Sequence, residues 1–200
     1  MFIQIIQGKC TRQDELRALA EQWREEMSPG ADGWLGGTYG FTDDDQFVGV
    51  VRFESREAAM TNSARPEQGA WAEKMTALMT GPVEYHDCDD VTLMMDGGSD
   101  DAGFVQVIRG KVEDPSALKA LMGDTEMLHE LRPDIIGASL AIEDDGTFTE
   151  TVAFTDEASA REGERRETPT MPEDVRTTLD SAMSNATFYD LHHPWFESRS

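Results

Sequence analysis

An eight-residue segment that occurs twice constrains this sequence most. Residues 2–9 read FIQIIQGK and residues 104–111 read FVQVIRGK, so five of eight positions are identical and two more exchange Ile for Val. Each copy is a β-branched run that ends at Gly-Lys, a pattern that predicts a central β-strand followed by a turn. Solenoid repeats recur every 20–50 residues, roughly, whereas the offset here, 104 − 2 = 102, is about half of the 200-residue chain. The sequence therefore predicts a duplicated domain.

The first half predicts the element order βαββαβ. Apolar residues at helical spacing predict an amphipathic helix from Thr11, its expected N-cap, to Met27. Two aromatic and β-branched runs around an acidic turn predict a hairpin over 34–53. Ser55 is the expected N-cap of the next of two helical segments, and a last strand is expected over 83–88.

The second half repeats this order. Asp114 is expected to cap a helix whose apolar face extends to Leu128, and a hairpin is expected over 135–154. Pro172 is expected to open another helix, and a strand over 187–191 closes the repeat.

Domain boundaries follow from the repeat. We expect a first ferredoxin-like repeat over 1–95, a linker over 96–103 and a second ferredoxin-like repeat over 104–200. Residues 91–95 are compatible with an additional strand or a packed extension, and the pattern does not choose between them.

A βαββαβ unit is the ferredoxin-like arrangement, with helices on one face of an antiparallel sheet. In the first strand, Ile3 and Ile5 point to one face. Phe2, Gln4 and Ile6 point to the other, so both faces carry apolar residues that need cover. We therefore expect an α+β protein whose two repeats pack sheet to sheet as a pseudo-dimeric α/β barrel.

Acidic side chains dominate both halves of the chain. There are 40 Asp and Glu residues against 17 Lys and Arg, a net charge of −23. Such a surface repels phosphate backbones and anionic lipid, which argues against nucleic-acid and membrane partners. The N-terminus leads into the first strand without a signal-peptide pattern, so we expect a cytoplasmic protein. We expect a monomer with pseudo-twofold symmetry or a weak homodimer.

Three segments of the chain carry a family resemblance. They are the opening strand, Pro29-Gly30 before a Gly-rich second strand, and FESREA at 53–58, with the more degenerate copy FTDEA at 154–158. In these the chain resembles the antibiotic biosynthesis monooxygenase-like domain of the dimeric α/β-barrel superfamily, in tandem duplication. The family includes cofactor-free oxygenases of polycyclic phenols, haem-degrading enzymes and members with no known activity.

The haem-degrading members of that family have an Asn on the first strand, a Trp in the second helical region and a ligating His after it. Here Gln4 and Gln106 stand on the first strands, and no Trp lies in the short segments after Ser55 or Asp156. The second helical regions contain no His. We expect neither haem nor any other cofactor.

Polar residues among apolar neighbours are the candidates for ligand binding. Gln4 and Gln106 occupy the same strand position, where a buried amide needs a hydrogen-bond partner in the protein, in water or in a ligand. Trp71 is a further ligand-binding candidate. A partner within the protein is the simpler account of the two amides.

Four residues of the first half are the catalytic candidates: Arg52, Asn62, Tyr85 and His86. Arg52, Asn62 and Tyr85, with Trp71, could serve an oxygenase that deprotonates a phenol and stabilises the resulting carbanion. Of these, only Tyr85 has an identical counterpart in the second half, Tyr189. We expect any active site to lie largely in the first half.

His86 also shares a strand face with Cys88 beside several Asp residues, which is compatible with metal ligation. A polar strand end is the simpler interpretation, and we expect no metal. Cys10 and Cys88 should lie at opposite ends of neighbouring strands and remain unpaired.

Three function classes remain open. They are a cofactor-independent oxygenase of small aromatic or hydrophobic molecules, a non-catalytic carrier or sensor of a small hydrophobic ligand, and a structural barrel protein. An enclosed apolar cavity with converging polar groups would favour the first two.

Overall fold

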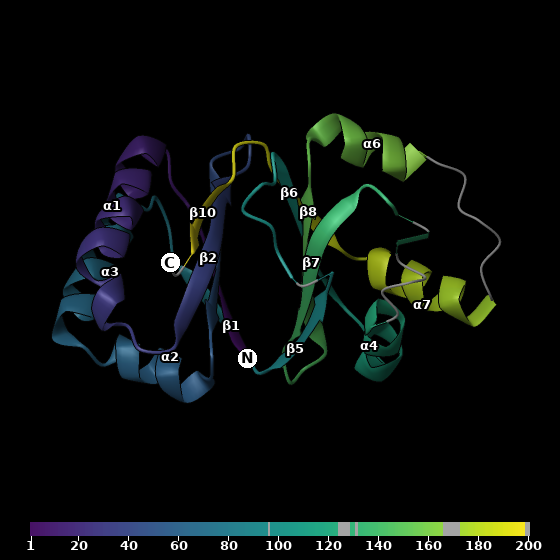
Figure 1. Cartoon of the computed structure of the whole chain (residues 1–200), viewed down its shortest axis with the longest axis horizontal. Helices are drawn as coiled ribbons and strands as arrows, with labels where there is room; N and C mark the ends of the chain where they lie inside the picture. Colours follow the sequence, from purple (N-terminus) through teal and green to yellow (C-terminus); the bar gives the residue numbers. More distant parts are fainter. Residues whose placement is uncertain (96, 124–128, 131, 166–172, 199–200) are drawn as a thin grey trace. The chain divides into compact units, whose positions relative to one another are not determined.

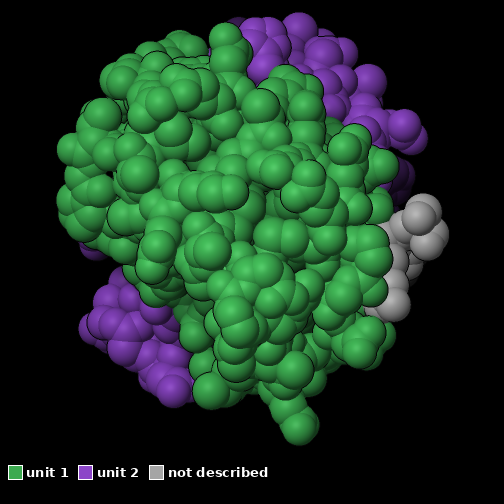
Figure 2. Space-filling model, turned by 90° about the vertical axis from the view of Figure 1, so that its left-hand side faces the viewer, with its two compact units in different colours: residues 1–89, 195–200 green, residues 90–194 purple. Residues whose placement is uncertain are grey.

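The computed structural model of the chain describes residues 1–95, 97–123, 129–130, 132–165 and 173–198, and Figure 1 shows its elements. The chain forms two compact units, coloured separately in Figure 2. Unit 1 consists of residues 1–89 and 195–200, and unit 2 of residues 90–194. Three predicted positions lie outside the described residues: Asp96 at the start of the linker, Leu128 at the end of an apolar helix face, and Pro172 at the start of a helix.

Unit 1 is a five-stranded antiparallel sheet in the order β10-β2-β3-β1-β4, with helices on one face (Figure 1). Its strands are β1 (Phe2–Lys9), β2 (Trp34–Phe41), β3 (Gln46–Phe53), β4 (Glu84–Cys88) and β10 (Trp195–Ser198). Its helices are α1 (Gln13–Glu26), the 3₁₀ turn η1 (Ser28–Gly30), α2 (Arg56–Ser63) and α3 (Pro66–Leu78).

Unit 2 repeats this architecture in the strand order β5-β7-β8-β6-β9. Its strands are β5 (Asp90–Met94), β6 (Phe104–Lys111), β7 (Ile135–Ile142), β8 (Thr147–Phe154) and β9 (Thr187–Leu191). Its described helices are α4 (Pro115–Gly123), α6 (Glu157–Arg165) and α7 (Glu173–Met183), which cover one face of the sheet in Figure 1. The predicted α+β class with two ferredoxin-like repeats is confirmed.

Strand register makes the repeat explicit. Phe2 pairs with Phe53 in unit 1, and Phe104 pairs with Phe154 in unit 2. The β2–β3 and β7–β8 pairings each contain one irregularity, directly after Trp34 and Ile135. The two repeats therefore share an irregularity of strand pairing as well as their topology.

Register also corrects one predicted equivalence. Tyr85 lies opposite Ile6, and the residue opposite the equivalent Ile108 is Phe188. Tyr189 lies one position further along β9, opposite Val107, and corresponds to His86. The identical tyrosines are therefore not equivalent. Equivalent residues of β4 and β9 are one residue further apart in the sequence than equivalent residues of β1 and β6.

The fifth strand of each sheet comes from a segment that sequence order alone would assign to the other repeat. Residues 90–94 form β5, which pairs with β7 of unit 2, and Trp195–Ser198 form β10, which pairs with β2 of unit 1. The boundaries of the two units therefore differ from the predicted boundaries at residues 95 and 104. An unpaired sheet edge exposes backbone N–H and C=O groups, and each added strand satisfies them along β2 or β7.

Most helix caps follow from local sequence. Ser55 accepts a hydrogen bond from the Ala58 amide at 3.2 Å, and Asp156 accepts one from the Ser159 amide at 2.8 Å. Asp114 accepts from the amide of Ser116 at 3.0 Å. The predicted Thr11 cap is wrong: α1 starts one residue later, with Arg12 at the N-cap and no side-chain capping bond.

The cores lie between each sheet and its helices. In unit 1 one cluster of buried residues surrounds Phe2 and Trp34, and another surrounds Ile6 and Phe47. Cys10, directly after β1, and Cys88 of β4 are both buried and are not joined by a disulfide, as expected from their separation. No helix within the described ranges is long and apolar enough to cross a bilayer.

Candidate functional site

A cavity of about 70 Å³ lies between the helices and the sheet of unit 1. Its floor comes from β1, β2, β3 and β10, and its roof from α1, α2 and α3. The walls are mainly aromatic and aliphatic, and a few polar side chains interrupt them. This combination is typical of a site for a small organic molecule.

Aromatic rings of the cavity wall are held in place by hydrogen bonds. Trp71 donates its indole N–H to the carbonyl oxygen of Leu19 at 3.0 Å, and Trp23 donates to Gln68 Oε1 at 2.7 Å. The two indoles meet edge to face, with ring centroids 6.5 Å apart. Because both N–H groups have partners, the indoles present apolar surface to the cavity.

Tyr39 lies along the sheet, and glycines make room for it. A Cβ atom at Gly37 would approach the Tyr39 hydroxyl oxygen to 2.1 Å, and one at Gly49 would approach its ring to 3.1 Å. The ring stacks on Trp195 of β10, with centroids 5.5 Å apart. The Gly-rich sequence of β2 is thus a packing requirement of Tyr39.

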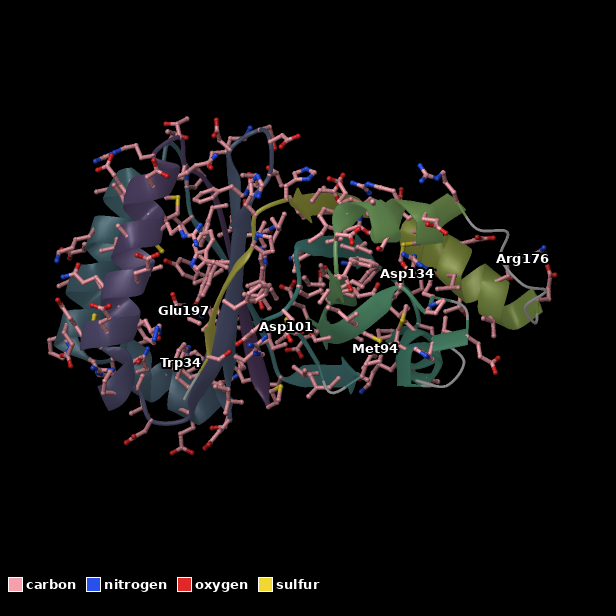
Figure 3. The ribbon with its side chains drawn as sticks, turned by 45° about the horizontal axis from the view of Figure 1, so that its top comes forward. Trp34, Met94, Asp101, Asp134, Arg176 and Glu197 are labelled. Carbon is pink, nitrogen blue, oxygen red and sulfur yellow. The ribbon has the colours of Figure 1, made fainter. Side chains whose placement is uncertain are left out.

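Glu197 brings a buried carboxylate to the cavity from β10. Its side chain is 8% exposed and forms an ion pair with Arg24, in which Glu197 Oε2 lies 2.9 Å from Arg24 Nε. Figure 3 places Glu197 on the helix side of the first sheet. Burial, with the added negative charge of Glu197, raises the pKa of the Tyr39 hydroxyl well above its usual value, so Tyr39 stays neutral.

Asn62 contributes a hydrogen-bond donor. It is 5% exposed, and its Oδ1 accepts from Arg65 Nη1 at 2.9 Å. Arg65 is itself anchored on the carbonyl oxygen of Met27 at 3.2 Å. Within the described part of the chain the Asn62 amide nitrogen has no acceptor, so it is available to a molecule in the cavity.

Gln4 also lines the cavity, but its amide is engaged in a structural network. Gln4 Nε2 donates to Asp87 Oδ1 at 2.8 Å, and Asp87 pairs with Arg56 at 3.4 Å. The Arg56 guanidinium lies over the Phe2 ring, 4.9 Å from its centroid. The network ties α2 to β1 and β4.

Gln106 has the equivalent network in unit 2. Its Nε2 donates to Asp190 Oδ1 at 2.8 Å, Asp190 pairs with Arg161, and that guanidinium lies over Phe104 at 5.3 Å. Arg161 is the fifth residue of α6, whereas Arg56 is the first residue of α2. The same contact is thus made from different helix positions. These bonds within the protein account for the repeated glutamine.

The structure separates the predicted catalytic residues. Arg52 lies opposite Ile3 and donates to Thr38 Oγ1 at 3.3 Å, and His86 lies opposite Ile5. Both are therefore on the sheet face away from the cavity, since side chains alternate along a strand. Tyr85 is 47% exposed on β4 and is not part of the cavity wall. Asn62, Trp71 and Gln4 do line the cavity.

Sequence reasoning missed the other polar groups of the cavity. Glu197, Tyr39 and Gln68 all line it. The repeat held a signal for Glu197, because residues 91–95 follow one last strand as 194–198 follow the other. Nothing in the local sequence of Tyr39 or Gln68 marks either as a site residue.

Unit 2 replaces these polar groups. Register places Leu140 at the position of Tyr39 and Met94 at the position of Glu197. Gly163 stands at the position of Asn62, and a Cβ there would meet the Asp134 carboxylate at 2.3 Å. The polar set around the cavity therefore belongs to unit 1. The described residues contain no group of three or more His, Cys, Asp and Glu placed to hold a metal ion.

No family model and no curated protein matches this sequence. Solved structures do match it along its whole length. A proposed monooxygenase from Lactobacillus acidophilus NCFM is 13% identical with a TM-score of 0.69, covering 98% of this chain and 96% of its own. A proposed monooxygenase from Fusobacterium nucleatum is 10% identical with a TM-score of 0.72, covering 100% of this chain and 94% of its own.

A third solved structure, an anthrone oxidase-like protein, is 10% identical with a TM-score of 0.60, covering 99% of this chain and 94% of its own. The chain shares the fold of these proteins. At such identities the likeness is one of fold alone. The predicted resemblance to a tandem monooxygenase-like protein is confirmed at that level.

Proposed function

We propose that unit 1 binds a small, neutral aromatic molecule in the cavity between its helices and its sheet. The observation that carries the proposal is the combination of aromatic walls with Glu197 and Asn62 in one cavity. A cavity needs a volume of about 10–15 Å³ to hold a single water molecule. The cavity, at about 70 Å³, has room for several waters or one small ring.

The charge of the site supports a neutral ligand. Burial and the Glu197 carboxylate raise the pKa of the Tyr39 hydroxyl in this cavity. A phenol bound there would meet the same surroundings, which disfavour a second negative charge beside the first. The site therefore favours a phenol in its protonated form and disfavours benzoate.

Cofactor-independent oxygenation of the bound molecule is the second candidate function. The Glu197 carboxylate could take a proton, and the Asn62 amide could donate to a developing oxyanion, because both side chains line the same cavity. The fold shared with proposed monooxygenases and an anthrone oxidase-like protein supports this candidate. The reaction would consume dioxygen.

Intrinsic fluorescence tests the binding proposal, because all four tryptophans of the chain lie in unit 1. Titrating the full chain with phenol should give a saturable change in emission. Ala20 of α1 lines the cavity, so Ala20→Phe should fill it and abolish the change. Ala18 is exposed on the same helix, and Ala18→Phe is the matched control.

A response that is absent in the wild-type chain, or equal in both variants, would refute binding in this cavity. An oxygen electrode separates the two candidate functions. Dioxygen uptake with phenol or 1-naphthol that Ala20→Phe abolishes would support the oxygenase. Saturable binding without uptake would leave a binding protein.

A further inference from the structure

The last strand of the chain supplies the carboxylate of the cavity. β10 pairs with β2 in antiparallel register, with Trp195 opposite Tyr39 and Glu197 opposite Gly37. Trp195 also packs against Phe41, with ring centroids 5.7 Å apart, which fixes the strand on the aromatic floor. Glu197 is therefore held in a defined position by the strand.

We propose that Glu197 determines which aromatic molecules the cavity accepts, by accepting a hydrogen bond from an O–H or N–H group on the ring. The cavity then prefers phenols and anilines to bare aromatic hydrocarbons and to aromatic carboxylates. This inference rests on the proposed function, since it names the ligands of that same cavity.

The first argument is the burial of the carboxylate beside the cavity. The Glu197 side chain is nine-tenths buried and lines the cavity, so a hydrogen bond that it accepts there is formed in a medium of low dielectric constant. Arg24 lies 2.9 Å from it and balances its charge. A carboxylate offers about four acceptor positions, so it can interact with groups of the protein and also accept from a ligand donor.

The second argument comes from the repeat. Met94 of β5 holds the position of Glu197 in unit 2 and is 1% exposed. The architecture is thus completed equally well by an apolar side chain of similar length. Replacing a buried ion pair by well-packed apolar residues is often neutral or stabilising. The fold alone therefore does not require a carboxylate at residue 197.

The third argument is the surroundings of the carboxylate. Asn62 presents an amide donor to the same cavity, and a hydroxyl group can accept from it while donating to Glu197. A phenol or an aniline can donate to Glu197, whereas toluene and anisole cannot. Benzoate would place a second carboxylate near Glu197, which is unfavourable in a buried site.

The test measures selectivity with phenol, anisole and toluene on the full chain. Hydrogen bonds to charged groups contribute about 1.5–3 kcal/mol, so the wild-type chain should bind phenol about tenfold or more tighter than anisole or toluene. Glu197→Met, which copies unit 2, should bind all three within about threefold of one another. Glu26→Met, on the exposed part of α1, should keep the wild-type preference.

The possible failures are distinguishable. If the wild-type chain binds none of the three probes, the proposed function is wrong. If it binds them without preference for phenol, or if Glu197→Met keeps that preference, the role of Glu197 is wrong and the cavity remains a binding site. Retained toluene binding shows that a variant still forms the cavity.

If Glu197→Met binds no probe at all, Glu197→Gln decides instead. The amide keeps the shape of the side chain and replaces the charged acceptor by a neutral one. It should reduce the preference for phenol over anisole several-fold while toluene affinity stays unchanged. An unchanged preference in Glu197→Gln would overturn the inference.

Discussion

Glu150 of β8 lies directly opposite Leu140 of β7 in unit 2, where unit 1 has Gly49 opposite Tyr39. Tyr39 needs a glycine across the strand pair, whereas the shorter Leu140 leaves space for a longer neighbour. Glu150 fills that space and is 7% exposed. Burial raises the pKa of its carboxyl to about 7, although the charge of Arg132 acts in the opposite direction.

Glu150 should make the stability of unit 2 depend on pH. Its pKa is raised from 4.5 in the unfolded chain to about 7 in the folded one, so the folded state binds the proton more tightly. This contribution is fully present below pH 4.5 and is lost as pH rises through about 7. This difference in pKa corresponds to about 3 kcal/mol of unfolding free energy as an order of magnitude.

Glu150→Gln should therefore raise the unfolding free energy at pH 8 relative to the wild-type chain, and the gain should vanish near pH 4.5. Urea unfolding followed by far-UV circular dichroism measures this, and the exposed Glu113→Gln is the control. Because the chain is strongly acidic, the informative quantity is the difference between variants. A difference that does not change between pH 4.5 and pH 8 would rule out a shifted Glu150.

The two structural glutamines should differ in their contribution to stability. Gln106 is 6% exposed and donates to both Asp190 and Glu164, so Gln106→Leu removes a donor from two partly buried carboxylates. Asp190 Oδ1 is the oxygen that loses its donor, and we expect a loss of about 1–3 kcal/mol. Gln4→Leu should cost less, because its partner Asp87 has a side chain that is 44% exposed. Equal losses in chemical denaturation would contradict the network as the role of Gln106.

Gly37 and Tyr39 should be energetically coupled. Gly37→Ala places a Cβ about where the Tyr39 hydroxyl lies, so it should destabilise unit 1 by about 1–3 kcal/mol. Unit 2 has Ala138 and Leu140 at these two positions. Adding Tyr39→Leu to Gly37→Ala should therefore recover much of the loss. A double-mutant cycle that shows simple additivity would exclude this coupling.

Removing the last strand should weaken unit 1 selectively. A chain that ends at Pro194 loses the buried Trp195 and leaves the β2 edge unpaired. Loss of a buried tryptophan costs about 3–5 kcal/mol, so tryptophan emission should report unfolding at lower urea concentration. A fragment of residues 1–95 lacks the same strand and should self-associate or be insoluble. A stable, soluble monomer of that fragment would contradict the need for β10.

Interactions between residues close in the sequence determined much of the fold of this protein. The repeated segment at 2–9 and 104–111 predicted two copies of one fold, because β-branched runs and turn residues act within a few positions of one another. The caps at Ser55, Asp114 and Asp156 were predictable for the same reason. The alternation of Phe2, Gln4 and Ile6 also placed these three side chains on a single face.

Only the tertiary structure decided which residues meet. Alternation along a strand shows that Arg52 and Val51 point to opposite faces, but it does not show which face the helices cover. Nor does it show which free edge an additional strand will join, because every exposed edge offers the same backbone groups. Glu197 reached the cavity by such a pairing, across more than 150 residues of chain from β2, and no local pattern could have placed it there.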